Sequence, residues 1–308
     1  MKALLPTGDP AKPVAYGEVD EPRPTPGQAL VKVEAFSVNR GEVFRLTGAL
    51  PGVGLRPGKD IAGLVVQAAA DGTGPRAGQR VVAHPPGGGW AEYAAVDTDR
   101  LAVLPDSVPT VAAAALPLAG LTALRLLRTA GSLAGRSLLI TGASGGVGHY
   151  TTELAVAAGA DVTAVSATPE RGRRLAEFGA TVVHDLADAV GPFHTVMESV
   201  GGPTTARALA LLRPHGELIW FGQASRRPAA LDFFAFFDGP SSAAVRHFHY
   251  EDFPEPYALD LATLVRLVAE SRLHPEIGRL ADWSATASVL TDLHDRRIAG
   301  NAVLTAGP

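Results

Sequence analysis

The sequence predicts an α/β protein of two domains, one rich in β-strands and one built on a doubly wound parallel sheet. The length of 308 residues allows two domains, and 46% hydrophobic residues supply a substantial core. Short apolar runs between proline and glycine clusters predict strands and turns in about the first hundred residues. From Ser137 onward, apolar β runs alternate with helical stretches, which is typical of a parallel sheet covered on both faces.

The first domain is expected to span residues 1–112 and to be completed by residues 258–308. Its predicted strands are 29–35, 61–68, 80–83 and 91–96. The tail predicts one or two helices and a final strand at 301–305, which we expect to rejoin the first domain because chain ends often lie close together. The alternative is that the tail extends the second domain.

The second domain is expected to span residues 113–257. Residues 111–129 contain few turn formers and predict helices that lead into it. Its predicted strands are 137–141, 161–166, 181–184, 195–199 and 217–222. Its predicted helices are 148–158, 169–178 and 203–213. This alternation predicts parallel strands joined by crossover helices.

Composition argues against several classes of function. The net charge is −4 and there is no long basic run, so no nucleic-acid or membrane partner is expected. Cysteine is absent, which removes disulfides, thiolate nucleophiles and cysteine-ligated zinc. The N-terminus MKALLPTGDP is unlike a signal peptide, and the longest apolar stretch, 111–124, is shorter than the roughly 20 residues that span a bilayer. We therefore expect a soluble cytoplasmic protein.

The most informative segment is a glycine-rich turn, ASGGVG at 143–148, which follows a predicted strand and opens a predicted helix. Ala143 stands where the strict dinucleotide-binding pattern has its first glycine. Gly145 and Gly146 allow the backbone to approach a pyrophosphate, Gly148 allows close helix packing, and the helix N-terminus supplies an anion site. The alternative is an ordinary glycine-rich turn, but the strand–helix–strand context favours a Rossmann nucleotide site.

The end of the next strand predicts the cofactor. Sites for NAD usually place a carboxylate there to bind the ribose hydroxyls. This sequence has Ser166 instead, followed by Arg171, Arg173 and Arg174. A small hydroxyl and a forked guanidinium suit a 2′-phosphate, so these residues favour NADPH over NADH, with Arg171 as the phosphate ligand. The alternative is that the three arginines form a solvated helix face.

At this point the sequence resembles the medium-chain dehydrogenase/reductase superfamily and, within it, the zinc-independent quinone oxidoreductases related to zeta-crystallin. The resemblance covers nearly the whole chain and is carried by AFSVNRGEVFRLTG (35–48), GKDIAGLVV (58–66), GGGWAEYAAV (87–96), AAALPLAGLTAL (113–124), the ASGGVG turn, MESVGGPTTARALALLRPHGELIWFG (197–222) and AGNAVLTAG (299–307). It implies a split GroES-like catalytic domain, a Rossmann domain between its parts, and a cleft where NADPH meets a small electrophilic acceptor. It also implies a homodimer.

The resemblance implies roles for individual residues. Asn39, the one catalytic position, and Thr122 would lie beside the nicotinamide. The pyrophosphate would be lined by Ser144, Gly145, Gly146 and Val147, the 2′-phosphate by Ser166 and Arg171, and the underside of the cofactor by Val200, Gly201, Phe221 and Gly222. The alternative for Asn39 is a turn residue, and that for Thr122 is a helix hydroxyl bonded to its own backbone.

The sequence departs from the zinc-dependent members of the superfamily. Those relatives carry a cysteine in the segment matching 37–39 and a histidine–glutamate pair in the segment matching 58–60, where this chain has SVN and GKD. No metal is therefore expected, and His84 is expected to be structural. Phe44 replaces a tyrosine that several relatives place near the substrate, and Glu198 replaces their usual aspartate.

These observations predict an NADPH-dependent, zinc-independent oxidoreductase that transfers hydride to a quinone. Hydride transfer needs no protein nucleophile, because the cofactor carries the reactive atom. A quinone or an α,β-unsaturated carbonyl delocalises charge onto oxygen, whereas a simple carbonyl needs a metal or an acid to polarise it. One alternative is an enoyl or 2-alkenal reductase that acts on an activated C=C bond. Another is a non-catalytic NADPH-binding protein, an idea that the missing tyrosine supports.

An aromatic segment at 231–257 contains eight of the nineteen aromatic residues. They are Phe233, Phe234, Phe236, Phe237, Phe248, Tyr250, Phe253 and Tyr257. Such a concentration suits either a wall for a flat substrate or a hydrophobic subunit interface, and we favour the interface.

Overall fold

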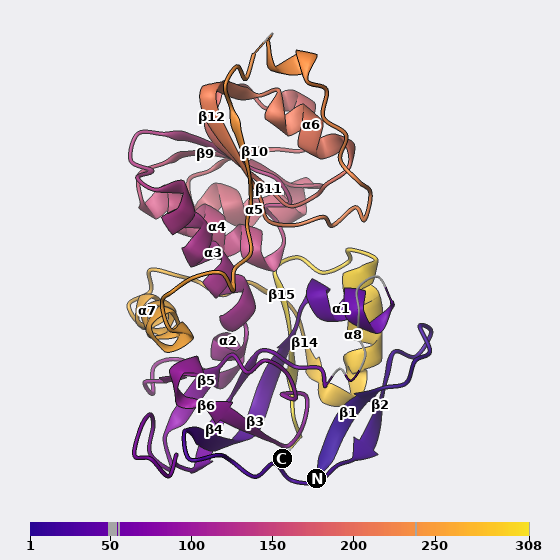
Figure 1. The fold of residues 1–308 in the computed structure, drawn as a ribbon, viewed down its shortest axis with the longest axis vertical. Coiled ribbons are helices and arrows are strands. Elements are labelled where there is room, and N and C mark those ends of the chain that lie inside the picture. The colour runs from indigo at the N-terminus through magenta and orange to yellow at the C-terminus, as the bar shows by residue number, and fades with distance from the viewer. Residues whose placement is uncertain (49–53, 55, 238, 308) are drawn as a thin grey trace. The chain divides into compact units, whose positions relative to one another are not determined.

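The computed structural model describes residues 1–48, 54, 56–237 and 239–307 (Figure 1). Contacts divide the chain into a first unit, Met1–Leu121 with Pro254–Pro308, and a second unit, Thr122–Phe253. The first unit therefore contains both ends of the chain. The expected domain limits after residues 112 and 257 stay a prediction.

The second unit is built on a parallel sheet. Among the described residues, six strands form it in the order β10-β9-β8-β11-β12-β13, and every neighbouring pair is parallel. The strands are β8 (Ser137–Ile140), β9 (Asp161–Val165), β10 (Thr181–Val183), β11 (Phe193–Glu198), β12 (Leu212–Trp220) and β13 (Ala244–His247). Counted along the chain, this is the order 3-2-1-4-5-6 of a doubly wound dinucleotide-binding sheet. The predicted parallel sheet is confirmed.

Both faces of the sheet are buried at its central strand, β8. Along β8, Leu138 and Ile140 belong to one apolar core and Leu139 belongs to another, and all three are fully buried. Side chains alternate across a strand, so the two cores lie on opposite faces of the sheet. This burial explains why the strand is apolar throughout rather than alternating with polar residues.

The helices that accompany this sheet are α3 (Pro117–Ala130), which begins in the first unit, α4 (Gly146–Ala157), α5 (Pro169–Glu177) and α6 (Pro203–Leu209). The helix predicted at 203–213 is shorter than expected, because α6 ends at Leu209 and Leu212 already pairs with Phe193 as the start of β12. Pro214 opposes the predicted end at residue 213, since a proline disfavours helical backbone at the residue before it.

The first unit is rich in β-strands, as predicted. Among the described residues, its larger sheet runs β14-β15-β3-β4-β5-β7, with β6 also paired to β3, while β1 and β2 form a separate ribbon. The strands are β1 (Lys2–Pro6), β2 (Val14–Glu18), β3 (Gln28–Val38), β4 (Ile61–Gln67), β5 (Arg80–Ala83), β6 (Tyr93–Asp97), β7 (Leu101–Val103), β14 (Ile277–Asp282) and β15 (Asn301–Thr305). Strand β15 pairs antiparallel with β3, from Ala302 opposite Val38 to Thr305 opposite Ala35. The final strand therefore rejoins the first unit, as expected.

The helices of this unit are α1 (Arg40–Leu46), α2 (Thr110–Ala114), α7 (Tyr257–Ala269) and α8 (Thr286–His294).

One apolar core supports the end of β3. The buried ring of Trp90 stacks on Phe36 with centroids 5.6 Å apart, and its indole N–H donates to the Ser37 carbonyl at 3.1 Å. These contacts fix the backbone just before Asn39. None of the helices in the described residues is both long enough and apolar enough to cross a membrane.

Candidate functional site

The glycine-rich turn joins β8 to α4 at the carboxyl end of the parallel sheet. Helix α4 begins at Gly146 with Gly145 as its N-cap, and its first turn has no acidic residue. The backbone N–H groups of Ser144 and Val147 donate no hydrogen bond within the described part of the chain. Such N–H groups at a helix N-terminus attract an anion, and the helix dipole adds to the attraction. The turn is therefore able to hold a phosphate group.

Glycine is required at two positions of this turn. Gly142 has a φ of +63°, and an added Cβ there would lie 2.6 Å from the Oγ of Ser199. At Gly148 an added Cβ would lie 2.5 Å from the Cα of Ala143, so only glycine lets α4 pack this closely on the turn. An added Cβ at Gly145 would come no closer than 3.4 Å to a neighbour. Gly142 thus serves as the tight-turn glycine, one residue before the position at which the sequence pattern places it.

Ser166 follows β9 at the same edge of the sheet. The N–H of Ala143 donates to the Val165 carbonyl at 3.1 Å, which ties the glycine-rich turn to the end of β9. Ser166 is buried, and its Oγ donates to the Thr168 carbonyl at 3.3 Å. His184, which follows the neighbouring β10, contacts the Ser166 carbonyl through Nδ1 at 3.0 Å. The segment between β9 and α5, residues 166–168, therefore offers two hydroxyl groups and contains no carboxylate.

The three arginines of α5 differ in their surroundings. Arg174 forms an ion pair with Glu177 at 2.7 Å. Arg173 is exposed, whereas Arg171 is half-buried and burial lowers its pKa. Arg171 also belongs to the first turn of the helix, where its N–H donates to the hydroxyl of Thr168 at 3.4 Å. Of the three, Arg171 combines partial burial with the position nearest to the end of β9.

The turns after β11 and β12 lie at this edge as well. The buried carboxylate of Glu198 accepts the N–H groups of Val200 at 2.7 Å and Gly201 at 3.0 Å. The N–H of Phe221 donates to the Glu198 carbonyl at 2.9 Å, and an added Cβ at Gly222 would lie 3.0 Å from the Ser199 carbonyl oxygen. The structure thus brings these predicted cofactor residues together near the reversal of strand order between β8 and β11, where dinucleotides usually bind.

Asn39, in the first unit, belongs to a buried cluster around Asp60. Its side-chain amide donates to Oδ2 of Asp60 at 2.7 Å and to the Oγ of Ser37 at 3.1 Å. The Ser37 hydroxyl donates to the same carboxylate oxygen at 2.7 Å. The other oxygen, Oδ1, accepts the N–H of Leu118 at 3.0 Å and contacts Nδ1 of His84 at 2.9 Å. We call these residues the Asp60 cluster; sequence reasoning did not predict that Asp60 would be its centre.

Glu42 holds the backbone of Asn39. Its Oε2 accepts the N–H of Asn39 at 2.7 Å, and its Oε1 accepts the N–H of Lys59 at 3.2 Å. Burial, together with the nearby charge of Asp60, raises the pKa of Glu42 to about 7. An asparagine followed three residues later by glutamate is a sequence signal for a helix start, so this contact was predictable from the sequence.

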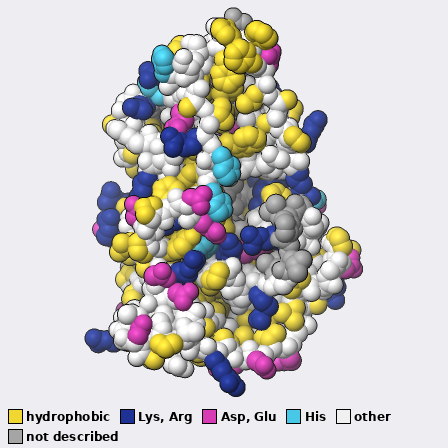
Figure 2. Space-filling view, viewed as in Figure 1, with side chains coloured by type: hydrophobic (Ala, Val, Ile, Leu, Met, Phe, Trp, Pro, Cys, Tyr) yellow, Lys and Arg dark blue, Asp and Glu magenta, His cyan; other side chains and the backbone are white. Residues whose placement is uncertain are grey.

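The first part of the aromatic segment is exposed. Phe233, Phe234 and Phe237 are 69%, 74% and 69% exposed, and their ring centroids lie between 5.5 and 6.4 Å apart. We call Phe233, Phe234 and Phe237 the phenylalanine cluster. Figure 2 shows hydrophobic side chains gathered at the top of the view, where the orange part of the chain lies in Figure 1.

Phe248, Tyr250 and Phe253 pack in or against a core of the second unit, whereas Tyr257 belongs to the first unit. Phe248 is buried in that core of the second unit. The buried guanidinium of Arg125, in α3, donates to the Tyr250 carbonyl at 2.6 Å and lies 5.2 Å from the ring of Phe253. Thr122, one helical turn before Arg125, is also buried. The eight aromatic residues therefore do not form one surface, and the choice between a substrate wall and a subunit interface stays a prediction.

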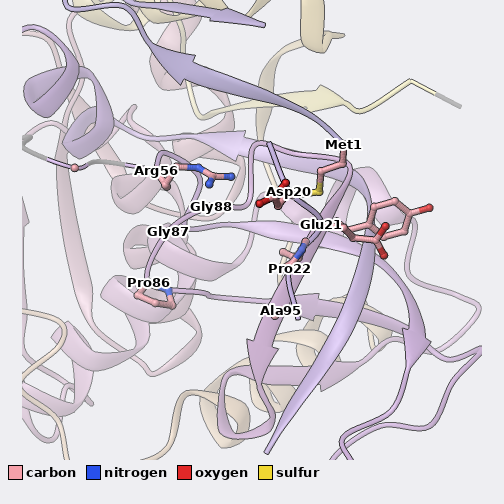
Figure 3. A pocket seen from close by; sticks show the side chains of 12 residues that line it. Met1, Asp20, Glu21, Pro22, Arg56, Pro86, Gly87, Gly88 and Ala95 are labelled. Carbon is pink, nitrogen blue, oxygen red and sulfur yellow. The ribbon is translucent and has the colours of Figure 1, made fainter. Parts of the chain in front are cut away.

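The first unit also contains a pocket. It has a volume of about 630 Å³, and its lining includes Met1, Asp20, Glu21 and Arg56 (Figure 3). None of the described residues that line it was predicted to bind the cofactor or the substrate. The pocket therefore adds no support to the predicted site.

Comparisons with known proteins identify the family. Residues 25–106 match the alcohol dehydrogenase GroES-like domain, and residues 146–263 match the zinc-binding dehydrogenases. The quinone oxidoreductase of Pseudomonas aeruginosa is 28% identical over 307 residues, which cover 94% of each chain. The trans-enoyl reductase of Aspergillus terreus is 30% identical over 210 residues, which cover 61% of this chain and 68% of the other. The chain belongs to the medium-chain dehydrogenase/reductase family, in its quinone oxidoreductase-like branch.

The fold of this medium-chain dehydrogenase/reductase also agrees with solved structures. The quinone oxidoreductase of Escherichia coli, solved in complex with NADPH, matches it with a TM-score of 0.88 at 21% identity, over 99% of each chain. The predicted combination of a GroES-like domain and a Rossmann sheet is confirmed.

Replacing Glu42 by glutamine is expected to flatten the pH dependence of stability. The pKa of Glu42 rises on folding from its ordinary value of 4.5 to about 7. Between these values the folded protein binds more protons than the unfolded chain, so the stability present below pH ~4.5 is lost as the pH rises through ~7. The loss from this group amounts to at most about 3 kcal/mol, and Glu42→Gln should remove it. Urea unfolding of both proteins at a series of pH values between ~5 and ~8 measures the difference.

Glu177→Gln is the matched control, because Glu177 is a surface carboxylate of α5 with 51% of its side chain exposed. It should leave the pH dependence of the free energy of unfolding unchanged. The prediction would be contradicted if the free energy of unfolding depended on pH in the same way in the wild type and in Glu42→Gln.

Proposed function

We propose that this chain is an NADPH-dependent oxidoreductase that transfers hydride to a quinone without zinc. The observation that carries the proposal is the carboxyl edge of the parallel sheet. There the N–H groups of Ser144 and Val147 have no partner among the described residues, and the neighbouring strand is followed by Ser166 rather than by a carboxylate. The similarity to the quinone oxidoreductase of Pseudomonas aeruginosa supports the reaction class.

The residues at this edge suit a dinucleotide. Those that would hold its pyrophosphate are Ser144, Gly145, Gly146 and Val147. Val200, Gly201, Phe221 and Gly222 would pack against it from the later strand ends. Bound NADPH supplies the hydride, so the protein has to bind the cofactor, orient it and exclude water. Asn39 and Thr122 are proposed to position the nicotinamide.

The preference for NADPH rests on charge at the end of β9. A carboxylate at this place would repel a 2′-phosphate, and Ser166 offers a small hydroxyl instead. Arg171, half-buried in the first turn of α5, is proposed to bind the phosphate through its guanidinium. Partial burial strengthens such a charge-assisted hydrogen bond, because solvent screens it less.

The proposal that no zinc is used rests on the donor chemistry of the Asp60 cluster. Each oxygen of the Asp60 carboxylate already faces two hydrogen-bonding groups, so little capacity is left for a metal. Ser37 and Asn39 supply a hydroxyl and an amide where zinc-dependent relatives supply a thiolate. Across the described residues, no group of three or more histidine, aspartate or glutamate side chains is arranged to hold a metal ion.

A quinone is proposed as the acceptor because its reduction needs no strong acid to polarise a carbonyl. The second candidate is the reduction of an activated C=C bond in an enoyl compound or 2-alkenal, which the similarity to the trans-enoyl reductase of Aspergillus terreus favours. In both cases the acceptor is a small electrophilic molecule. We expect the enzyme to act in the cytoplasm without a nucleic-acid or membrane partner.

The decisive experiment measures oxidation of NADPH and NADH by the purified protein with a panel of quinones and a panel of 2-alkenals. Turnover of NADPH with quinones is the expected result, and turnover with 2-alkenals alone would favour the second candidate. If the protein is stabilised by NADPH in a thermal shift assay but reduces no acceptor, a non-catalytic NADPH-binding protein becomes the better interpretation.

Replacing Arg171 by alanine is expected to weaken the binding of NADPH far more than the binding of NADH. Loss of a hydrogen bond between charged groups corresponds to a rise of about 10- to 100-fold in the Kd for NADPH. The Kd for NADH should not rise, because NADH has no 2′-phosphate to form that hydrogen bond. Fluorescence titration with both nucleotides measures the effect. Arg173→Ala, at the exposed neighbouring arginine, is the matched control and should change neither Kd by more than about twofold. An equal loss of affinity for both nucleotides in Arg171→Ala would exclude the proposed role.

We further propose that the protein forms a homodimer through the phenylalanine cluster and the adjoining sheet edge. Strand β13 pairs only with β12 in the described chain, and all four of its residues are exposed. An open edge strand beside exposed aromatic side chains is suited to pairing with another chain. Interface cores are also enriched in aromatic residues.

Replacing Phe234 by glutamate is expected to convert the dimer into a monomer, because it places a charge in a desolvated apolar contact. Sedimentation velocity at micromolar concentration should show a wild-type species of twice the 31.8 kDa chain mass and a variant at the chain mass. Val190→Glu is the matched control, since Val190 is 86% exposed outside the cluster. A monomeric wild type, or a Phe234→Glu variant that stays dimeric, would refute this assembly.

A further inference from the structure

Glu198 is a fully buried carboxylate at the end of β11. Its Oε1 accepts the N–H groups of Val200 at 2.7 Å and Gly201 at 3.0 Å and the hydroxyl of Thr141 at 3.2 Å. Its Oε2 accepts the hydroxyl of Thr205 at 3.0 Å and the N–H of Gly201 at 3.2 Å. All of these groups are donors, so the position requires a side chain that only accepts. A buried charge is tolerated where such donors compensate for its lost hydration.

The donors come from three segments of the second unit. Thr141 directly follows β8, Val200 and Gly201 form the turn after β11, and Thr205 lies in the first turn of α6. Thr141 also holds Ser199, because its hydroxyl accepts the Ser199 N–H at 3.0 Å and its carbonyl accepts the Ser199 hydroxyl at 3.1 Å. The carboxylate therefore joins the turns after β8 and β11 at the reversal of strand order.

The backbone hydrogen-bonding groups of the turn after β11 have their partners within the protein. The N–H groups of Val200 and Gly201 bond Glu198, and the Val200 carbonyl accepts the N–H of Ser225 at 2.7 Å. Gly201 has a φ of +76°, and an added Cβ there would lie 2.6 Å from the Cγ of Gln223. What the turn offers a ligand is therefore shape and carbon surface rather than hydrogen-bond donors.

We propose that Glu198 is a positioning residue for the cofactor, which holds the turn of Val200 and Gly201 in the shape against which a nicotinamide dinucleotide packs. The inference rests on the proposed function, in which those two residues contact the cofactor. A shorter carboxylate at this position is expected to reach the N–H groups two and three residues ahead, as in an Asx turn. Glutamate makes these bonds and also bonds Thr141 and Thr205.

The test compares Glu198→Gln and Glu198→Asp in the whole protein. Glutamine keeps the length but replaces one acceptor by an NH₂ group, which then faces other donors. Hydrogen exchange at the amides of Val200 and Gly201 should accelerate, and the Kd for NADPH should rise about tenfold. If an acceptor that the wild type reduces is found, steady-state kinetics of Glu198→Gln should show a larger change in the KM for NADPH than in kcat. Aspartate keeps the acceptors nearest the turn and should restore most of the amide protection and most of the affinity.

Thr205→Val is the matched control, because it removes one buried hydroxyl bonded to Glu198 and leaves the turn N–H groups bonded. It should lower the Tm while the Kd for NADPH stays within about twofold of the wild type. Unchanged exchange at Val200 and Gly201 in Glu198→Gln would overturn the inference, and so would an equal loss of NADPH affinity in Thr205→Val. Failure of the wild type to bind NADPH would instead refute the proposed function, and the exchange data alone would then decide whether Glu198 holds the turn.

Discussion

The burial of β8 on both faces is the constraint on which the second unit depends. Leu138 and Ile140 enter one core and Leu139 enters the other, so a shift of one residue would exchange the two faces. Fixing β8 in this way fixes the parallel pairing of its neighbours, whose carboxyl ends then share one edge. Ser166 and Glu198 stand at that edge because the strands beneath them are packed, not because of any attraction between the two residues. The geometry of the candidate site is thus a consequence of the core.

Buried carboxylates then arrange the loops that leave the strands. Asp60 in the first unit and Glu198 in the second are fully buried, and donors reach both oxygens of each. Only one arrangement of the surrounding loops brings all of these donors to the carboxylate, and removing a partner leaves a buried charge uncompensated. In the first unit the residue held in this way is Asn39, and in the second it is the turn of Val200 and Gly201. Each carboxylate therefore fixes the conformation of residues in its own unit that are proposed to contact the cofactor.

The sequence predicted the second unit more fully than the first, and the reason is physical. Its central strands are apolar runs separated by helices, so each carries its own local signal. In the first unit the final strand was predicted to return, but the sequence did not identify β3 as its partner, because the two are separated by most of the chain. Strand β7 has only three residues, too few for a pattern. Strand β13 gave no signal because all of its residues are exposed and its backbone pairing alone defines it. The Asp60 cluster was likewise not predictable, since its donors at residues 37, 39, 84 and 118 meet only in the fold.

The same cluster connects the fold to the proposed chemistry. The family that matches residues 146–263 is named for zinc binding. A shared fold does not fix the chemistry, however, because the chemistry depends on the individual side chains at the site. Both N–H groups of the Asn39 side chain already donate, one to Asp60 and one to Ser37, so this amide has none left to take over the role that a Lewis acid has in zinc-dependent relatives. A site without a polarising group of this kind suits the proposed acceptors, because quinones and conjugated enones spread the developing charge themselves.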